Sequence, residues 1–588
     1  MAVVDGTLPG MSIAPYASAE VRMFGGEHRW RTAFLLGLTL CAKQPNRARQ
    51  GRSRRTLAVL QSQADTFDVV IIGSGMGGLS AGAILAKEGF RVCVCEAHSI
   101  PGGVAHSFKR EGYDFDSGPS LLAGLSTSSA TRAINPLRQI LNAVDEDVDE
   151  WVAYNGWRMI TPEGDFDFEV GSEEAWKEVL KKFGTESDTL EQWSRLQKAL
   201  QPLTDAVTNF PSACLRTDLG ASRTMAGYFR QFLAVLRIGP RAQAPFQSVL
   251  DEARITDRFL LQWFNYICFV LQALPAKQHQ LAPVAFMMDS LYPVGRFLDY
   301  PKGGVGSLVD ALVAGVEKNG GEVRLKSAVE SILIEDGVAT GVKLKQGQEI
   351  RAETAVISNA STWDTARLLP ESCAADWKAA GGDPEPTRSF LHLHIGFKAE
   401  GLDPKALRLH YSVINAWEPI DGEGNVVIVS IPSVVDPSLA PPGRHCLHAY
   451  VAATEPFELW QGLDRSSSAY KKLKEERCEV LWKAVERIIP DIRQRVDVKL
   501  LGSPLTHARF TRRHQGSYGP YARASDSPLA GLSLPGAKTP IPQLLRCGDS
   551  TFPGIGVPSS AASGVAAATT LLTVKQHLAL LKRMKIPA

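Results

Sequence analysis

Long apolar runs are missing from this 588-residue sequence. Its apolar stretches at residues 33–42 and 259–274 are shorter than the ~20 residues that a membrane-spanning helix needs. A strong charge of one sign is missing as well, because the formal net charge is +2, and this argues against nucleic acid as a partner. The nine cysteines are scattered and odd in number, which favours a reducing compartment over a disulfide framework.

Signatures of hydrolytic and metal sites are also lacking. No Ser-His-Asp arrangement or paired acid set is recognisable, so the catalytic residues stay unknown at this point. His392 and His394 alternate in "SFLHLHIGF" and share one face of a predicted strand, but no third ligand has a recognisable spacing. A structural pair, a cavity-facing polar pair and a metal-binding pair are the alternatives, and we predict no metal site.

What is present is an ordinary globular composition, with 44% apolar and 21% charged residues. A chain of this length exceeds one compact core, so we expect two interleaved domains. The first 65 residues differ because they are rich in arginine and poor in acids, which is typical of an organelle transit peptide. A basic tail without this role and a secretory-type signal beginning at Met23 are the alternatives.

A dinucleotide-binding motif follows this leader. The segment "FDVVIIGSGMGGLSAGAILAKEGFRVCVCEA" predicts a strand, a tight turn, a helix and a second strand. Its glycines Gly73, Gly75 and Gly78 form G-x-G-x-x-G, which allows a sharp turn, a close pyrophosphate and tight helix packing. Glu96 follows the second strand, where an acid accepts hydrogen bonds from an adenosine ribose and repels a 2′-phosphate. We therefore predict FAD or NAD rather than NADP.

The next segments favour FAD. Gly102 and Gly103 supply a second close backbone approach, which a long extended cofactor needs. A later glycine cluster, "YPKGGVGS", precedes a helix expected over residues 306–318, but it lacks the preceding strand and the spacing of a second dinucleotide motif. We therefore expect a bound flavin and no dedicated nicotinamide domain.

The C-terminal segment "CGDSTFPGIGVPSSAASG" combines glycines, prolines and small side chains with a single acid. A helix is expected from Ser559 to Leu572, with Pro558 in its first turn. Its small side chains leave the N-terminal amides free to face the flavin N1–O2 edge, where negative charge develops on reduction. Ordinary packing of a small-residue helix against the sheet is the alternative.

These motifs, in this order, resemble the phytoene desaturase and carotenoid (prolycopene) isomerase family of FAD-dependent oxidoreductases, a branch of the amine-oxidase-like superfamily. The resemblance extends from Phe67 to Leu572 and is most particular in "YPKGG" and "CGDSTFPGIGVP". It implies that Asp549 faces the ribityl and phosphate part of FAD. Relatives often have a basic residue after the glycine doublet, whereas Val104 stands here. The cofactor contacts predicted from motifs and resemblance together are Gly73, Gly75, Gly78, Glu96, Gly102, Gly103, Val329, Gly548, Asp549 and Val557.

The resemblance implies an α/β fold in which a discontinuous Rossmann-type FAD-binding domain is interleaved with an α+β substrate domain. The expected parts are a leader, 1–65; FAD-binding parts at 66–130, 300–365 and 535–575; substrate parts at 131–299 and 366–534; and a tail, 576–588.

Two segments of the predicted substrate domain stand out. Residues 259–274, "FLLQWFNYICFVLQAL", are unusually apolar for a surface helix. A helix that lines an apolar tunnel, a monotopic membrane contact and plain core are the alternatives. The stretch "TRRHQGSYGPYA", residues 511–522, concentrates Arg512, Arg513 and His514. It is either a solvated loop or a lid near the flavin.

A flavin beside an apolar tunnel favours chemistry on a polyene lipid, because a hydrocarbon offers no ionisable group for side-chain catalysis. With the resemblance, we predict a carotenoid cis–trans isomerase acting on a poly-cis carotene, in a plastid and with peripheral membrane contact. A desaturase or saturase that passes electrons to a quinone or oxygen is the alternative, since both reactions use the same flavin and tunnel. An amine oxidase and a non-enzymatic prenyl-binding escort protein are alternatives from other classes.

Overall fold

The computed structural model describes residues 65–118, 120–126, 134–216, 218, 220–381, 383–525 and 534–586. All of them belong to one unit, Ser62–Ala588. The predicted leader, 1–65, lies outside the described residues apart from Asp65. No helix within the described ranges has both the length and the apolar character needed to cross a bilayer.

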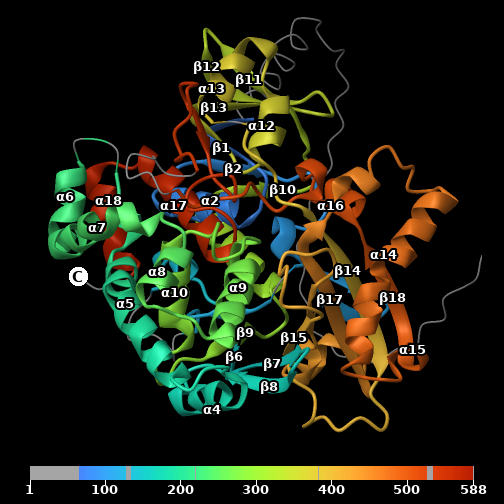
Figure 1. Cartoon of the computed structure of the whole chain (residues 1–588). Coiled ribbons are helices and arrows are strands. Elements are labelled where there is room, and N and C mark those ends of the chain that lie inside the picture. The colour runs from blue at the N-terminus through green and yellow to red at the C-terminus, as the bar shows by residue number, and fades with distance from the viewer. Residues whose placement is uncertain are drawn as a thin grey trace, which may run out of the picture. The chain divides into compact units, whose positions relative to one another are not determined.

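A seven-stranded sheet carries the dinucleotide motif (Figure 1). Its strands are β1 (Thr66–Ile72), β2 (Val92–Cys95), β10 (Glu322–Arg324), β11 (Val329–Glu335), β12 (Val338–Leu344), β13 (Glu349–Ser358) and β19 (Leu544–Arg546). They are ordered β10-β2-β1-β13-β12-β11, with β19 also paired to β13. The pairs β10–β2, β2–β1, β1–β13 and β13–β19 are parallel, whereas β11–β12 and β12–β13 are antiparallel. Three distant stretches of the chain therefore meet in this first sheet.

The second half of β1, Val69–Ile72, is a continuous apolar run because both faces of the strand are covered. Val69 and Ile71 belong to a core formed with helices, and Val70 and Ile72 belong to another formed with β11–β13 and Trp377. Burial on both faces is typical of a parallel strand. The covering helices are α2 (Met76–Lys87), α3 (Pro136–Val144), α11 (Gly306–Glu317) and α17 (Val557–Leu571) on one face and α13 (Ala374–Ala379) on the other. The predicted strand–turn–helix–strand unit and the helix predicted at 306–318 are confirmed.

A second seven-stranded sheet follows the order β18-β14-β17-β16-β15-β7-β8. Its pairs are antiparallel except for β15 and β7, which are parallel. One face packs on α14 (Ser468–Glu486), and the other faces α9 (Arg258–Gln272) and α10 (Leu281–Leu291) (Figure 1). The bounds are β7 (Gly156–Thr161), β8 (Gly164–Glu169), β14 (Ser389–Lys398), β15 (His410–Ile414), β16 (Val426–Ser430), β17 (Arg444–Glu455) and β18 (Val496–Gly502).

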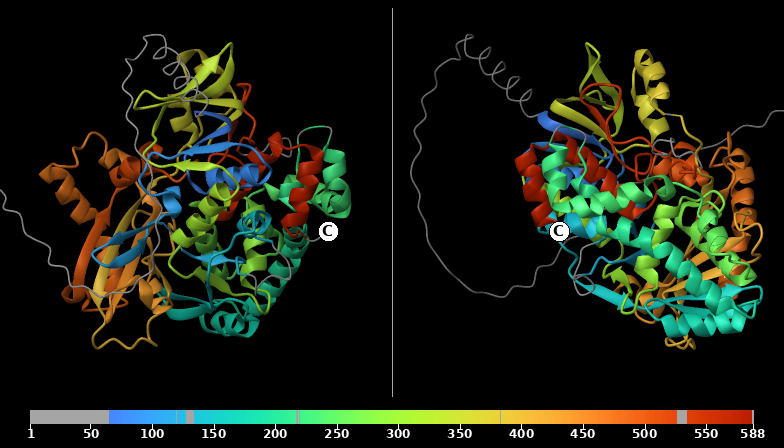
Figure 2. Two further views of the ribbon diagram at one scale, coloured as in Figure 1. Left: turned by 180° about the vertical axis from the view of Figure 1, so that it is seen from behind. Right: turned by 60° about the vertical axis from the view of Figure 1, so that its left-hand side comes forward.

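Shorter strands and further helices complete the described structure. A small sheet contains β5 (Leu122–Ala123), β9 (Leu298–Pro301) and β6 (Trp151–Tyr154), and β3 (Ser107–Arg110) pairs with β4 (Tyr113–Asp116). Figures 1 and 2 show α18 beside α6 and α7. The remaining helices are α4 (Glu173–Phe183), α5 (Thr189–Asn209), α6 (Ala221–Met225), α7 (Phe229–Ala242), α8 (Gln247–Glu252), α12 (Thr362–Leu368), α15 (Ile492–Arg495), α16 (Pro504–Phe510) and α18 (Val574–Arg583). The α/β fold class is as predicted, whereas the exact domain boundaries stay a prediction.

The small side chains of α17 are explained in part by its contact with α2. A Cβ atom at Gly564 would lie 2.3 Å from the carbonyl oxygen of Gly77 in α2, so any larger residue would force the two helices apart. Ala561, Ser563 and Ala567 in α17 are buried as well. The helix thus packs closely on α2, and it begins at Val557, with Pro558 in its first turn as expected.

Gly564→Ala should lower the free energy of unfolding by about 1–3 kcal/mol, the usual cost of overpacking. Gly227→Ala, in the short 3₁₀ helix Ala226–Tyr228, is a matched control, because nothing lies within 4 Å of an added Cβ atom there. Alanine in that open helical position should instead stabilise the protein by ~0.5–1 kcal/mol. Urea unfolding of both variants measures the contrast, and equal effects of the two substitutions would contradict this account of α17.

Candidate cofactor and substrate site

One cavity of about 1730 Å³ extends from the first sheet to the second. At one end it is lined by the turns that follow β1, β2 and β19 and by the beginning of α17. The rest of its wall comes from α7, α9, α10 and the second sheet and is largely apolar. Because pockets for a single small ligand are typically ~300–1,000 Å³, this volume has room for a long cofactor together with a second, apolar ligand.

The turn between β1 and α2 is built by the predicted glycines. Gly73 has φ +91°, and Gly75 is the N-cap of α2, with no side chain capping it. A Cβ atom at Gly75 would lie 2.8 Å from Nδ2 of Asn359, the residue that follows β13. A Cβ atom at Gly78 would lie 2.2 Å from the carbonyl oxygen of Gly73. Gly73 and Gly75 line the cavity, whereas Gly78 lets the helix pack on the turn.

Glu96 holds its carboxylate at the cavity wall. Its Oε2 accepts hydrogen bonds from the Ser74 backbone N–H (2.9 Å) and hydroxyl (2.6 Å). Its Oε1 accepts from the backbone N–H of His98 (2.7 Å). An ionised carboxylate has about four acceptor sites, so Glu96 keeps capacity for the hydroxyl groups of a ligand. The position after β2 is the one that the dinucleotide motif predicts for such a group.

The glycine doublet lies directly against the first turn. Gly102 donates its backbone N–H to the carbonyl oxygen of Ser74 (3.0 Å) and forms a parallel bridge with Gly75. Both Gly102 and Gly103 have positive φ angles, +108° and +59°. A Cβ atom at Gly103 would lie 3.1 Å from the Cα atom of Gly75. The two glycine-rich segments therefore form one backbone surface along the cavity.

The C-terminal segment closes the same end of the cavity. Gly548 has φ +95° and donates its N–H to Ser563 Oγ (2.8 Å), and the next residue, Asp549, lines the cavity. The Asp549 carboxylate forms an ion pair with Arg513. Val557 begins α17 after the N-cap Gly556, which provides no side-chain cap.

Two helix N-termini thus meet this end of the cavity, those of α2 and α17. Neither has a side-chain cap or an acidic residue in its first turn. The first N–H groups of a helix lack intrahelical partners, and the helix dipole places partial positive charge there. This end of the cavity therefore fits a ligand that carries phosphates and a site of negative charge, as a flavin dinucleotide does.

All of the predicted cofactor residues except Gly78 line this cavity, including Val329 at the start of β11. Their contact with the cofactor stays a prediction. Asn359 is an addition that the motif analysis did not assign to this site, whereas Arg513 lies in the stretch for which a lid near the flavin was one alternative. Asn359 carries a signal in the sequence, because it directly follows a strand that is parallel to β1. The pairing of Arg513 with Asp549 depends on tertiary structure alone.

The two substrate-domain segments singled out in the sequence also reach the cavity. In α9, Tyr266, Ile267 and Phe269 line it, and the helix is otherwise largely buried in a core. Residues 259–274 therefore both line an apolar cavity and belong to a core, as two of the three alternatives stated. The third alternative, a monotopic membrane contact, is wrong for this helix because it is buried. In the stretch 511–522, Arg513 and Tyr518 line the cavity beside Asp549.

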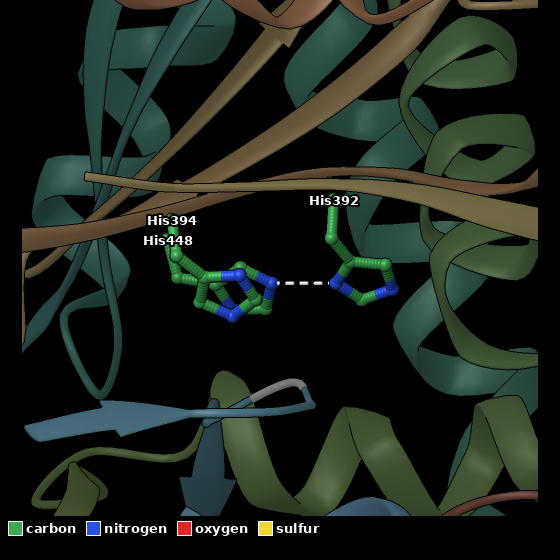
Figure 3. Close-up of side chains that lie close together, drawn as sticks. All are labelled: His392, His394 and His448. Atoms are coloured by element: carbon green, nitrogen blue, oxygen red, sulfur yellow. Dashed lines mark hydrogen bonds between the residues drawn. The ribbon is translucent and has the colours of Figure 1, made fainter. Parts of the chain in front are cut away.

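A cluster of histidines lies on the face of the second sheet that includes part of the cavity wall (Figure 3). His392 and His394 share one face of β14, as predicted, and His448 on β17 joins them. The rings of His394 and His448 are stacked, with centroids 4.2 Å apart, and His392 Nδ1 lies 2.7 Å from His448 Nε2. Nitrogen ligands ~2.0–2.1 Å from a tetrahedral metal would lie farther apart than this. The geometry favours a hydrogen bond between neutral rings over a metal centre.

Burial explains why these rings are neutral. It lowers the pKa of His394 to about 4 and holds the pKa values of His392 and His448 well below the ordinary value. Burial also lowers the pKa of the neighbouring His507 to about 3. At neutral pH this face therefore offers hydrogen-bonding groups without charge.

Comparisons with known proteins identify the family. The model of the flavin-containing amine oxidoreductases matches residues 76–572. The chain belongs to this family. Prolycopene isomerase 1, chloroplastic, of an Oncidium hybrid cultivar is 32% identical, covering 86% of this chain and 83% of its own length. The chloroplastic prolycopene isomerase of Arabidopsis thaliana is 30% identical, covering 85% and 81%. All-trans-retinol 13,14-reductase of Rattus norvegicus is 26% identical, covering 83% of each chain.

Solved structures agree on the fold. An oxidoreductase from Methanosarcina mazei is similar with a TM-score of 0.53, at 21% identity, over 84% of this chain and 98% of its own. Putrescine oxidase bound to putrescine is similar with a TM-score of 0.54, at 14% identity, over 86% and 98%. The predictions of family, fold class and enzymatic character are confirmed, and the protein is a flavin-dependent enzyme of the oxidoreductase or isomerase kind.

Asp549→Ala should weaken flavin retention at least about tenfold, because a charge-assisted contact is lost and Arg513 is left unpaired. Asp497→Ala is the matched control, since Asp497 is also paired with an arginine, Arg444, but lies outside the cavity. Flavin absorbance per mole of purified protein, followed by titration with free cofactor, measures the effect. Full flavin occupancy in Asp549→Ala would contradict this role.

Proposed function

We propose that this protein is an FAD-dependent enzyme that acts on the polyene chain of a carotenoid-type lipid, and that its reaction is cis–trans isomerisation. The observation that carries the proposal is one continuous cavity, in which an end suited to a dinucleotide opens into an apolar chamber. A soluble, charged substrate would find few partners in that chamber. A long hydrocarbon chain would bury its surface there favourably.

The residues of the polar end would hold FAD in an extended form. Glu96 would accept hydrogen bonds from the adenosine ribose, and the α2 N-terminus would face the phosphates. The α17 N-terminus would stabilise negative charge at the ring system, and Asp549 would contact the ribityl side. Bound FAD supplies reversible electron exchange with a conjugated chain. The chamber excludes water and positions the chain, with Tyr266 and Phe269 of α9 in its wall.

The relatives support the substrate class and the location. Two prolycopene isomerases and a retinol reductase share most of their length with this chain, and all three are named for polyene substrates. Both isomerases are chloroplastic, which together with the arginine-rich leader supports a plastid location. The retinol reductase favours a second candidate, a saturase- or desaturase-type reaction that exchanges electrons with a quinone or oxygen.

Anaerobic incubation with a poly-cis carotene should distinguish the candidates. We expect all-trans product only when the bound FAD has been reduced, because isomerisation requires electron density to enter the conjugated chain and return. Chromatography before and after the reaction measures the products. The same protein with oxidised FAD is the control, and a partly saturated carotene with a quinone is the competing arm. Consumption of the partly saturated carotene alone would favour desaturation, and no conversion in either arm would contradict the proposal.

Peripheral membrane contact is proposed through α7 rather than α9. The α7 patch consists of the exposed apolar side chains Phe229, Leu233 and Leu236. Phe229 and Leu236 are 59% and 56% exposed. Phe232 and Val235, also on α7, line the cavity together with Leu215. Helix α7 thus combines an exposed apolar surface with the basic residues Arg230 and Arg237, and it borders the apolar chamber. Apolar side chains enter the acyl region of a membrane, and arginines attract anionic lipid headgroups, so this combination suits contact with an anionic lipid surface.

The double variant Leu233→Glu, Leu236→Glu should lower binding to vesicles of neutral and anionic phospholipid at least about tenfold, because two leucines lose burial worth ~1.5–3 kcal/mol each. Leu459→Glu, a change at another exposed leucine (45%), should leave binding unchanged. Flotation with the vesicles gives the bound fraction, and flavin absorbance reports that the variants are folded. Equal binding of the double variant and the control would place the membrane contact elsewhere.

A further inference from the structure

The glycine turns at the cofactor end of the cavity carry no basic side chain that would balance the charge of a diphosphate. Val104 follows the glycine doublet, and the next bases along the chain are engaged elsewhere. Lys109 forms an ion pair with Asp114 (3.3 Å). Arg110 forms one with Glu111 (3.2 Å), and neither base lines the cavity. Because a charge removed from water is favourable only when it is paired, the countercharge is expected from another part of the chain.

Arg513 is the least exposed of the arginines and lysines in the described cavity wall. Its side chain is 16% exposed. The other members of this set are exposed: Lys345, Arg367, Arg509 and Arg512. Water and salt screen an exposed charge much more than a partly buried one. Arg513 is therefore the cation that a ligand in the cavity experiences with the least screening.

The Arg513 guanidinium is held on two sides and keeps donors for a third partner. Its Nε donates to the backbone carbonyl oxygen of Ser517, and its Nη2 donates to the Asp549 carboxylate. Its Cζ lies 5.3 Å from the centroid of the Tyr518 ring. Its Nη1 has no hydrogen-bond partner among the described residues and is not one of the polar atoms sealed in the interior. A guanidinium fixed in this way suits the planar, charge-assisted contact that arginine makes with phosphate.

Arg513 also lies beside the helix N-terminus to which the dinucleotide motif assigns the phosphates. A Cβ atom at Gly77, in the first turn of α2, would lie 2.8 Å from the backbone nitrogen of Gly548. Asp549 follows Gly548 directly, so its ion pair holds the Arg513 guanidinium near this end of α2. A pyrophosphate in such a motif binds at the helix N-terminus.

The stretch that carries Arg513 follows the course expected for an extended FAD. Phe510 lines the cavity and contacts His98, with ring centroids 5.8 Å apart. The His98 backbone N–H is in turn bound to Glu96, the expected partner of the adenosine ribose. Arg513, three residues after Phe510, is paired with Asp549, which the proposed function places at the ribityl side. The diphosphate is the part of FAD that connects these two ends.

We propose that Arg513 binds the diphosphate of FAD through Nη1 while Nη2 stays paired with Asp549. Arg513 is then a cofactor-binding residue that links the cofactor to the C-terminal segment. The stretch 511–522 contributes to the cofactor site rather than forming a solvated loop. This inference rests on the part of the proposed function that names FAD, because a flavin without a diphosphate would not supply this partner.

Release of flavin from the holoenzyme tests the inference. The purified protein is diluted, the rise in free-flavin fluorescence gives the release rate, and chromatography identifies the released flavin. Arg513→Gln should release FAD at least about tenfold faster than the wild type, because a charge-assisted hydrogen bond is lost. Arg444→Gln is the matched control, since Arg444 is also paired with an aspartate, Asp497, but does not line the cavity. Its release rate should equal that of the wild type.

A double-mutant cycle separates a direct contact from an effect that passes through Asp549. If Arg513 only held Asp549 in place, Arg513→Gln would add nothing in an Asp549→Asn background. We expect at least about fivefold faster release in that background as well, because the diphosphate contact is still there to be lost. Arg513→Lys, which keeps the charge without the planar fork, should release FAD at an intermediate rate. Circular dichroism shows which variants are folded, and Arg513→Lys in both backgrounds decides the question should Arg513→Gln not fold.

The midpoint potential of the bound flavin, measured with excess FAD, distinguishes the diphosphate from the flavin ring. An arginine at the ring would stabilise the negative charge of the reduced form, so its loss would lower the potential. We expect Arg513→Gln to keep the wild-type potential.

The outcomes separate this inference from the proposed function. A wild-type release rate in a folded Arg513→Gln, no added effect in the Asp549→Asn background, or a lowered potential would overturn the role of Arg513 and leave FAD as the cofactor. Release of a flavin without a diphosphate from the wild type would instead contradict the FAD of the proposed function.

Discussion

At one edge of the first sheet, backbone segments from different parts of the chain lie unusually close together. This close packing positions the residues at the cofactor end of the cavity. β1 has parallel partners on both sides, so the segments after β1, β2 and β13 leave the sheet at the same edge, where α/β proteins bind ligands. A Cβ atom at Gly75, Gly77 or Gly548 would lie within 3 Å of Asn359 atoms. Without side chains at these positions, segments from the two ends and the middle of the chain can meet around one asparagine.

This arrangement divides the cavity into two electrostatic environments. Near the first sheet lie two helix N-termini, the carboxylate of Glu96 and the Asp549–Arg513 ion pair. Toward the second sheet the wall is largely apolar, and burial keeps its histidines neutral. A charged cofactor and an uncharged lipid can therefore share one space.

Local patterns were sufficient for the elements around the motifs. β1, α2, α11 and α17 begin within a few residues of their predicted positions, because glycine and proline restrict where a strand or helix can begin or end. Alternation along one strand was also sufficient to place His392 and His394 on one face. It was not sufficient to find His448, because the register between β14 and β17 brings that residue opposite His394.

By itself, the sequence determined the dinucleotide turn, the α/β class and the family, since these depend on spacings within short segments. Only the tertiary structure decided that the cofactor end and the apolar chamber form one cavity and that α9 is buried while α7 is exposed. The physical reason is that burial and hydrogen-bond satisfaction depend on which faces of distant strands and helices pack together, and no local pattern of side chains specifies this.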